Sequence, residues 1–224
     1  MKAVLFDMDG VLVDVSRSYR LAIKKTAEYF LGRKISLSTI QEYKNLGGFN
    51  NDWDLTTRIL KDFGKNIEKE NLIDVFQGIY YGENGEGLIR NEKWILGVKI
   101  LQEIRKRFRL GIVTGRPAKE ALHALRRFGT EDYFPVLVAM EDVPLEKAKP
   151  DPFGIRLAMK RLRTDKAFYA GDTVDDMRAA RRAGVIPIGV VNDAAGFERQ
   201  STLLLSSGAQ WVLKDINDIG EVLG

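Results

Sequence analysis

The sequence predicts an α/β fold: a parallel β-sheet covered by helices, with an all-helical segment inserted after the first strand. Short apolar runs alternate with helical patterns through the second half of the chain, which is typical of a parallel sheet covered on both faces. Residues 15–87 instead show helical periodicity and no convincing strand. A chain of 224 residues is long enough for one sizeable domain carrying such an insert.

Each predicted strand is a short apolar run of the kind buried on both faces of a sheet. The five runs are AVLF (3–6), LGIVT (110–114), VLVA (136–139), AFYAG (167–171) and IPIGVV (186–191). The segments between the later runs have apolar residues at helical spacing or end at a helix-stopping glycine. These predicted helices cover 94–108, 118–129, 152–162 and 175–184.

The insert is predicted to contain helices over 19–31, 54–64 and 70–82. The stretch GENGEG (82–87) that follows is predicted to be a flexible, glycine-rich connection. We therefore expect a core domain formed by 1–14 and 88–224, and an inserted helical domain over 15–87.

Composition excludes several classes of site. The chain has no cysteine, so disulfides and thiolate metal sites are absent. No run approaches the roughly 18 apolar residues of a membrane span, and no secretory leader is evident. The net charge is only +4, and the basic run RKRFR (105–109) is interpreted as the solvated end of an amphipathic helix. We expect a cytoplasmic protein that binds neither membrane nor nucleic acid.

The polar residues of interest follow the predicted strands. In open α/β sheets, ligands bind at the carboxyl ends of the strands. The ends of three predicted strands and one proline-containing loop would place carboxylates, a hydroxyl and an ammonium at this edge. The candidate site residues in these segments are Asp7, Asp9, Thr114, Gly115, Arg116, Lys149, Asp172 and Asp176. Clustered carboxylates suit a hard cation such as Mg²⁺, which keeps waters and substrate phosphate among its ligands. The lysine and threonine would complement the phosphate.

Four segments, DMDGVLVD, VTGR, KPDP and GDTVDD, resemble in order the four motifs of the haloacid dehalogenase (HAD) superfamily. The resemblance implies a Rossmann-like, HAD-like core. It also implies that the helical insert is a cap, as in the phosphoglycolate phosphatase and β-phosphoglucomutase branch. The expected cofactor is Mg²⁺.

The resemblance also implies roles for individual residues. Asp7 matches the nucleophile that attacks phosphorus and forms an aspartyl-phosphate. Asp9 matches the general acid/base, which protonates the leaving alkoxide and later activates water. Thr114, with Gly115 beside it, matches the motif whose hydroxyl holds the phosphoryl oxygens. Lys149 matches the ammonium that offsets charge on the nucleophile and the phosphate.

The same comparison implies the metal ligands. Asp172 matches the magnesium ligand, beside the Asp7 carboxylate and the backbone carbonyl of Asp9. Asp176 matches the second acid of the fourth motif, which supports the metal mostly through water. Its neighbour Asp175 is interpreted as flanking the following helix, and Asp14 as part of a hinge or turn.

Other interpretations stay open at several positions. Thr114 could cap the helix beginning near Pro117, and Lys147 is an alternative to Lys149. Arg116 departs from the small polar residue common in the branch. It could bind a substrate carboxylate or second phosphate, or pair with a structural acid.

The insert contains the stretch NLGGFNNDWD (45–54), in which Asn51 and Trp53 are candidates for substrate contact when a cap closes. The alternative is structural. In that case Asn51 or Asp52 caps the next helix, and Trp53 packs at the seam between cap and core.

These observations predict a magnesium-dependent phosphatase, a phosphoric monoester hydrolase acting on a small phosphorylated metabolite, as a monomer or homodimer. The alternative is a phosphomutase of the β-phosphoglucomutase type. A haloacid dehalogenase fits less well because Asp9 is present. A phospho-accepting receiver domain is a different class, but receivers are shorter, begin with adjacent acids and lack a helical insert.

Overall fold

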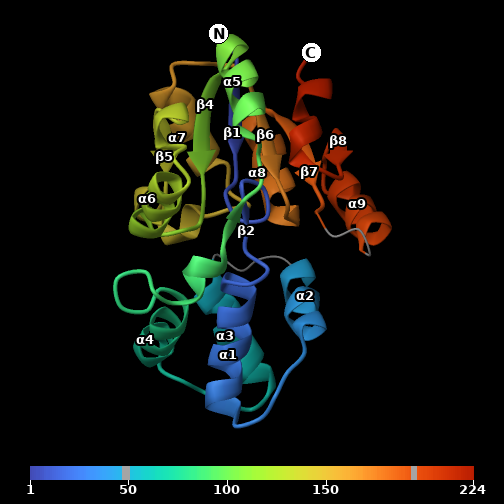
Figure 1. Cartoon of the computed structure of the whole chain (residues 1–224). Coiled ribbons are helices and arrows are strands. Elements are labelled where there is room, and N and C mark those ends of the chain that lie inside the picture. The colour runs from blue at the N-terminus through green and yellow to red at the C-terminus, as the bar shows by residue number, and fades with distance from the viewer. Residues whose placement is uncertain (47–50, 193–195) are drawn as a thin grey trace. The chain divides into compact units, whose positions relative to one another are not determined.

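The computed structural model describes residues 1–46, 51–192 and 196–224. The chain forms two compact units, one joining Met1–Val13 to Trp94–Gly224 and the other comprising Asp14–Lys93 (Figure 1). A two-stranded sheet of β2 (Val13–Asp14) and β3 (Lys93–Trp94) lies at the two crossings of the chain between the units. The return crossing therefore falls later than residue 87, where the sequence places the end of the insert.

The first unit is built on a six-stranded sheet in the order β5-β4-β1-β6-β7-β8. Every neighbouring pair is parallel, which confirms the predicted α/β core. The strands are β1 (Ala3–Phe6), β4 (Arg109–Val113), β5 (Val136–Val138), β6 (Ala167–Gly171), β7 (Ile186–Val190) and β8 (Trp211–Leu213). The strand β8 was not predicted, because a three-residue edge strand has too little apolar pattern to be distinguished from a loop.

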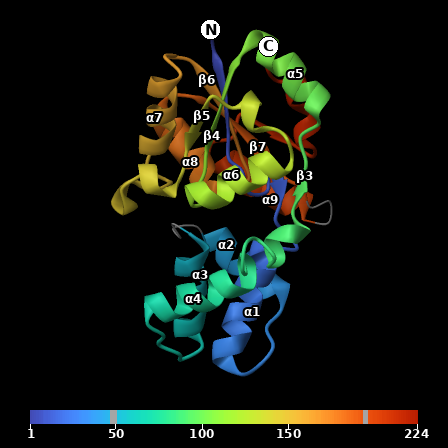
Figure 2. The ribbon, with the colours of Figure 1, turned by 60° about the vertical axis from the view of Figure 1, so that its left-hand side comes forward.

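Helices cover both faces of this sheet, and alternate residues of β1 serve the two faces. Leu5 belongs to a buried cluster with Ile155 and Ala180, which come from two of the helices. On the other face the Phe6 ring meets Phe134 edge-on at 6.0 Å. The helices are α5 (Val98–Arg107), α6 (Ala118–Arg127), α7 (Phe153–Arg161), α8 (Val174–Ala183) and α9 (Phe197–Ser206). Figure 2 shows the strands between α7 and α5.

The basic run at the end of α5 packs against its own unit. Arg107 donates to the carbonyl oxygen of Leu223 at 3.3 Å, and Arg109 donates to that of Arg163 at 3.1 Å. The Arg105 guanidinium lies 5.6 Å from the ring centroid of Tyr133. Only Arg105–Arg107 of the run form the end of α5, because Phe108 is its buried C-cap and Arg109 begins β4. The run is therefore only in part the solvated helix end that the sequence predicts.

The second unit is helical. It comprises α1 (Tyr19–Leu31), α2 (Leu37–Leu46), α3 (Asp52–Asp62), α4 (Lys69–Tyr80) and the 3₁₀ turn η1 (Leu88–Asn91). The sequence prediction missed α2, where Ile40 is the one apolar side chain that is fully buried and the apolar periodicity is weak. Buried Ile23, Leu55, Ile59 and Phe76 form part of its core. Across the described ranges of both units, no helix combines the length and apolar character needed to cross a membrane.

The GENGEG stretch lies inside the second unit and is not the link between the units. Its backbone is held to the end of α4, since Gly82 N donates to Gln77 O at 3.0 Å and Gly87 N to Tyr81 O at 2.9 Å. Gly82, Asn84 and Gly85 all adopt positive φ, which favours glycine and asparagine. The glycines are therefore needed for a hydrogen-bonded turn.

Candidate active site

The strand ends bring the candidate residues to one edge of the sheet. Asp7 follows β1, and its backbone N donates to Ala170 O of β6 at 2.8 Å. Thr114 follows β4, and its backbone N donates to Val138 O of β5 at 2.9 Å. Asp172 directly follows β6. Because all strands are parallel, these residues share the carboxyl edge, where ligands bind in sheets of this type.

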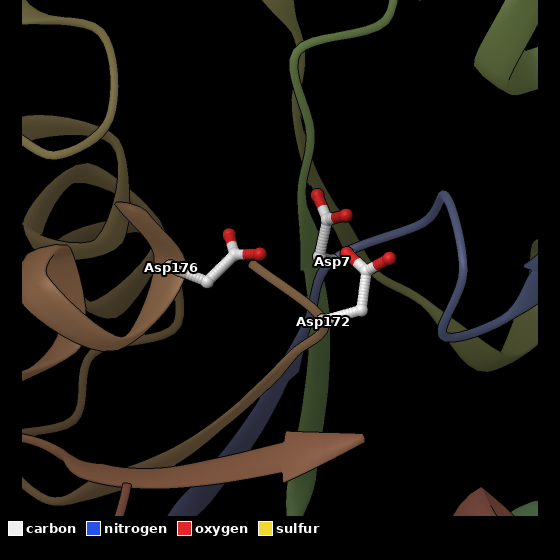
Figure 3. A group of neighbouring side chains, drawn as sticks. All are labelled: Asp7, Asp172 and Asp176. Carbon is white, nitrogen blue, oxygen red and sulfur yellow. The ribbon is translucent and has the colours of Figure 1, made fainter. Parts of the chain in front are cut away.

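Three acids form a compact group at this edge. One carboxylate oxygen from each of Asp7, Asp172 and Asp176 lies within 4.8 Å of the others. Figure 3 shows the Asp7 and Asp172 side chains next to each other, with Asp176 reaching toward them from α8. Asp7 is only 5% exposed and Asp176 is fully buried. Their repulsion therefore occurs where little solvent screens it.

Lys149 supplies the opposite charge. Its Nζ donates to Asp7 Oδ1 at 2.8 Å and to Asp176 Oδ1 at 2.6 Å. Burial acts to lower the pKa of Lys149, but the charges of Asp176 and Asp7 outweigh it and raise the pKa well above its usual value. Lys147, the alternative considered from the sequence, instead places its ammonium 5.0 Å from the ring centroid of Phe153.

The charge of Lys149 does not cancel the effects that raise the pKa of Asp7. Burial, followed by the charges of Asp176, Asp172 and Asp9, raises the pKa of Asp7 well above its ordinary value, despite the opposing effect of Lys149. The protein alone therefore disfavours the ionised form of Asp7. A further cation beside Asp7 and Asp172 would reverse this preference.

Asp176 is saturated with hydrogen bonds from the protein. Its Oδ1 accepts from Lys149 Nζ and from Tyr169 OH at 3.0 Å. Its Oδ2 accepts from the backbone N of Thr173 at 3.1 Å and from Thr173 Oγ1 at 2.6 Å, which closes a capping box on α8. Burial opposes ionisation, but Lys149 and these hydrogen bonds lower the pKa of Asp176. Asp175, by contrast, lies 3.8 Å from Arg178 Nη1 on the same helix.

Tyr169 is a member of this network that the sequence reasoning missed. It lies in the middle of β6 with no exposed surface, and its hydroxyl contacts Lys149 Nζ at 3.2 Å. The same hydroxyl lies 3.2 Å from the carbonyl oxygen of Val113. A tyrosine in an otherwise apolar, doubly buried strand was the available signal, because a buried hydroxyl needs a partner.

The turn after β1 lies in close contact with the Asp172 side chain at Gly10. Gly10 has φ +75°, and a Cβ at this position would overlap the Asp172 carboxylate. Asn192, just after β7, donates from Nδ2 to Gly10 O at 2.6 Å. Asn192 was also missed, because a single exposed asparagine after a strand carries no recognisable pattern.

Thr114, Gly115 and Arg116 form the turn after β4. Thr114 Oγ1 accepts from the backbone N of Arg116 at 3.1 Å, and the N-cap of α6 is Pro117. Thr114 therefore does not cap that helix. The Arg116 side chain is completely buried, and its Nε forms an ion pair with Asp9 Oδ1. The partner of Arg116 is therefore an acid, but Asp9 is itself a candidate catalytic residue and not the structural acid considered from the sequence. Substrate binding by Arg116 stays a prediction.

Comparison with known proteins identifies the family. The model of the haloacid dehalogenase-like hydrolases matches residues 4–190. The chain belongs to this family. The phosphorylated carbohydrates phosphatase of Thermotoga maritima is 30% identical, with all of both chains covered.

Two further relatives are informative. A solved Thermotoga maritima structure named "putative beta-phosphoglucomutase" superposes with a TM-score of 0.71 at 27% identity, over the full length of both chains. The imidazoleglycerol-phosphate dehydratase of Phytophthora nicotianae is 38% identical over 85% of this chain, but this chain spans only 43% of that protein.

The candidate substrate residues of the insert lie in the helical unit of this HAD-family hydrolase. Asn51 is the N-cap of α3, and its Oδ1 accepts from the backbone N of Asp54 at 2.9 Å. Trp53 is partly buried in the first turn of α3. Residues 47–50, which include the two glycines of the stretch, lie outside the described residues. Substrate contact by Asn51 and Trp53 stays a prediction.

The acid group of the HAD-family hydrolase has the donor chemistry of a hard divalent cation site. It offers only carboxylate oxygens, and the raised pKa of Asp7 marks a place where positive charge is needed. Both oxygens of Asp176 accept hydrogen bonds from the protein. Direct metal ligation by Asp7 and Asp172 stays a prediction.

Proposed function

We propose that the protein is a magnesium-dependent phosphatase that hydrolyses small phosphorylated metabolites through an aspartyl-phosphate on Asp7. The observation that carries the proposal is the position of Asp7 between the Lys149 ammonium, 2.8 Å from its Oδ1, and the Asp172 carboxylate. Membership in a hydrolase family supports it, as does the name of the Thermotoga maritima phosphatase.

The first step is a displacement at phosphorus. A carboxylate oxygen of Asp7 forms a bond to phosphorus while the bond from phosphorus to the substrate oxygen breaks. Lys149 offsets the charge on Asp7 and the phosphoryl group, and the Thr114 hydroxyl donates to a phosphoryl oxygen. Asp9 donates a proton to the departing alkoxide. Phosphoryl transfer depends mainly on positioning and charge, so no histidine or thiol is required.

The second step returns Asp7 to its starting form. Asp9 takes a proton from a water molecule whose oxygen attacks phosphorus, and the bond between phosphorus and Asp7 breaks to release phosphate. Asp7 and Asp172, with the backbone carbonyl of Asp9, would hold Mg²⁺. Bound there, the ion would supply the positive charge that the phosphoryl oxygens and the acids require.

The test is a phosphate-release screen over a panel of phosphorylated metabolites, with and without magnesium, using wild type and Asp7→Asn. We expect release that stops on chelation and in Asp7→Asn, because the amide cannot form the aspartyl-phosphate. Asp74→Asn, a substitution in the helical unit, is the control and should keep wild-type turnover. Undiminished release by Asp7→Asn would refute the nucleophile assignment.

A phosphomutase is the second candidate, favoured by the similarity to the Thermotoga maritima structure named for β-phosphoglucomutase. In that case the phosphoryl group on Asp7 passes to a sugar hydroxyl in place of water. Incubation with a hexose 1-phosphate, followed by ³¹P NMR, distinguishes the two. Accumulation of the 6-phosphate isomer without inorganic phosphate indicates a mutase, and accumulation of phosphate indicates a phosphatase.

A further inference from the structure

The ion pair between Arg116 and Asp9 joins the first and second motif turns. Arg116 Nε donates to Asp9 Oδ1, and the two residues are 107 positions apart. The Arg116 side chain is completely buried, whereas the Asp9 side chain is 28% exposed. A buried guanidinium therefore holds a carboxylate that retains access to solvent.

Both backbone groups of Arg116, the N–H and the carbonyl oxygen, are hydrogen-bonded. Its N donates to Thr114 Oγ1 at 3.1 Å, and its carbonyl oxygen accepts from Met140 N at 2.9 Å, just after β5. The guanidinium thus projects from a turn that is tied to the ends of β4 and β5. A planar, permanently charged group on such a frame orients a carboxylate more strictly than a flexible lysine does.

Asp9 lies in a turn whose backbone is also tightly held. Gly10 N donates to Val13 O at 2.8 Å, and Leu12 N donates to Met8 O at 2.9 Å. This backbone leaves the Asp9 side-chain torsions as the main remaining freedom of its carboxylate. The ion pair with Arg116 restricts those torsions.

We propose that Arg116 is a positioning residue for Asp9: it binds Oδ1 and so orients the carboxyl group for proton transfer to the leaving group from Oδ2, the oxygen that would carry the proton. The inference rests on the proposed function, because it concerns the acid of that reaction. It predicts that replacing Arg116 lowers kcat/KM by an amount that depends on the leaving group. An alkoxide must be protonated as it departs, whereas 4-nitrophenolate leaves without a proton.

The experiment compares kcat/KM for 4-nitrophenyl phosphate and for the best alkyl phosphate of the metabolite screen. The variants are Arg116→Met, Arg116→Lys, Asp9→Asn and the double variant Arg116→Met with Asp9→Asn. Arg126→Met is the control, because Arg126 forms an exposed ion pair with Glu131 at the far end of α6. Melting temperatures show whether each variant is folded.

General acid catalysis typically raises the reaction rate by about 10²–10⁴-fold. A displacement of a reacting group by about 1 Å can lower the rate by about 10²-fold. We therefore expect Arg116→Met to lower kcat/KM for the alkyl phosphate by roughly 10–100-fold and to change it little for 4-nitrophenyl phosphate. Arg116→Lys should restore part of the loss. In the Asp9→Asn background, Arg116→Met should have no further effect, since the residue acts through Asp9.

The outcomes separate the failure of this inference from that of the proposed function. Equal losses on both substrates, at wild-type melting temperature, would overturn the positioning role alone and indicate a contact with the phosphoryl group. A further loss from Arg116→Met in the Asp9→Asn background would overturn it in favour of direct substrate binding. Absence of release by the wild-type enzyme from either substrate would overturn the proposed function, and this inference with it.

Discussion

Gly10 and Asp172 approach so closely that no side chain fits between them. Gly10 lies in the turn after β1 and Asp172 at the end of β6, and an added Cβ would overlap the Asp172 carboxylate. The contact sets the distance between the turn of the first motif and the acid of the fourth. It makes a glycine necessary for steric reasons as well as for its positive φ.

Gly10→Ala should therefore displace Asp172 in addition to straining the backbone. The left-handed backbone costs about 1–2 kcal/mol for alanine, and displacement of a metal-supporting group typically costs about 10–100-fold in metal affinity or activity. Calorimetric titration with magnesium and a thermal melt measure the two effects. Gly32→Ala is the matched control, because Gly32 has φ +66° with open space around it. Equal magnesium affinity in the two variants would contradict the argument.

Asp7→Asn should change how the stability of the metal-free protein depends on pH. The pKa of Asp7 is raised in the folded state, chiefly by burial, so the folded protein retains a proton that the unfolded chain releases at about pH 3.9. This contribution is complete below that pH and is lost as the pH rises toward the folded pKa. The asparagine variant lacks it.

Melting temperatures in EDTA, taken from about pH 4 to about pH 8, test this. The wild type should lose stability over this range relative to Asp7→Asn, which should be the more stable protein at neutral pH. With magnesium present, the wild type should be the more stable of the two proteins, because the ion binds beside the ionised Asp7 carboxylate and offsets its charge. Parallel curves for the two proteins in EDTA would show that Asp7 titrates as an ordinary carboxyl.

Tyr169→Phe should weaken both stability and turnover. Removing the hydroxyl deprives Lys149 and Asp176 of a shared partner beneath the site. We expect a loss of about 1–2 kcal/mol in unfolding free energy and a fall in kcat of roughly tenfold, because Lys149 is held less firmly. Urea unfolding and steady-state kinetics measure the two quantities.

Tyr43→Phe is the control for Tyr169→Phe, since it removes another tyrosine hydroxyl that donates to a carboxylate, that of Asp62 at 2.9 Å. It should lower stability slightly and leave kcat unchanged. If Tyr169→Phe also left kcat unchanged, the hydroxyl of Tyr169 would contribute to stability and not to the positioning of Lys149.

Trp53→Ala should change KM more than melting temperature if the indole contacts substrate. Trp53 is only partly buried in the first turn of α3, so its removal leaves the core of the helical unit intact. Kinetics over the metabolite panel, together with a thermal melt, provide the measurement. Asn51→Ala provides the comparison, because loss of its cap to Asp54 should cost about 1 kcal/mol. A lower melting temperature with unchanged KM would instead assign Trp53 to packing.

Local sequence patterns were sufficient to predict much of the core domain. Five strands are apolar runs, and the helices between them have a regular apolar face, so both could be predicted. Three elements were missed: β8 has only three residues, α2 has one fully buried apolar side chain, and α9 was not predicted. Their formation depends on packing against other elements: β8 pairs with β7, α2 packs against α1 and α3, and α9 packs against β7, β8 and α8.

The sequence by itself determined the parallel core, the helical insert and the types of residue at the ends of its strands, because these depend on local periodicity and on short motifs. The family resemblance already implied that Lys149 offsets the charge of Asp7, and the structure gives that contact its geometry. Only the tertiary structure decided that Arg116 pairs with Asp9 and that Tyr169 contacts both Lys149 and Asp176. Those contacts join residues from different strands and turns. Their geometry follows from strand order and packing, which local periodicity does not encode.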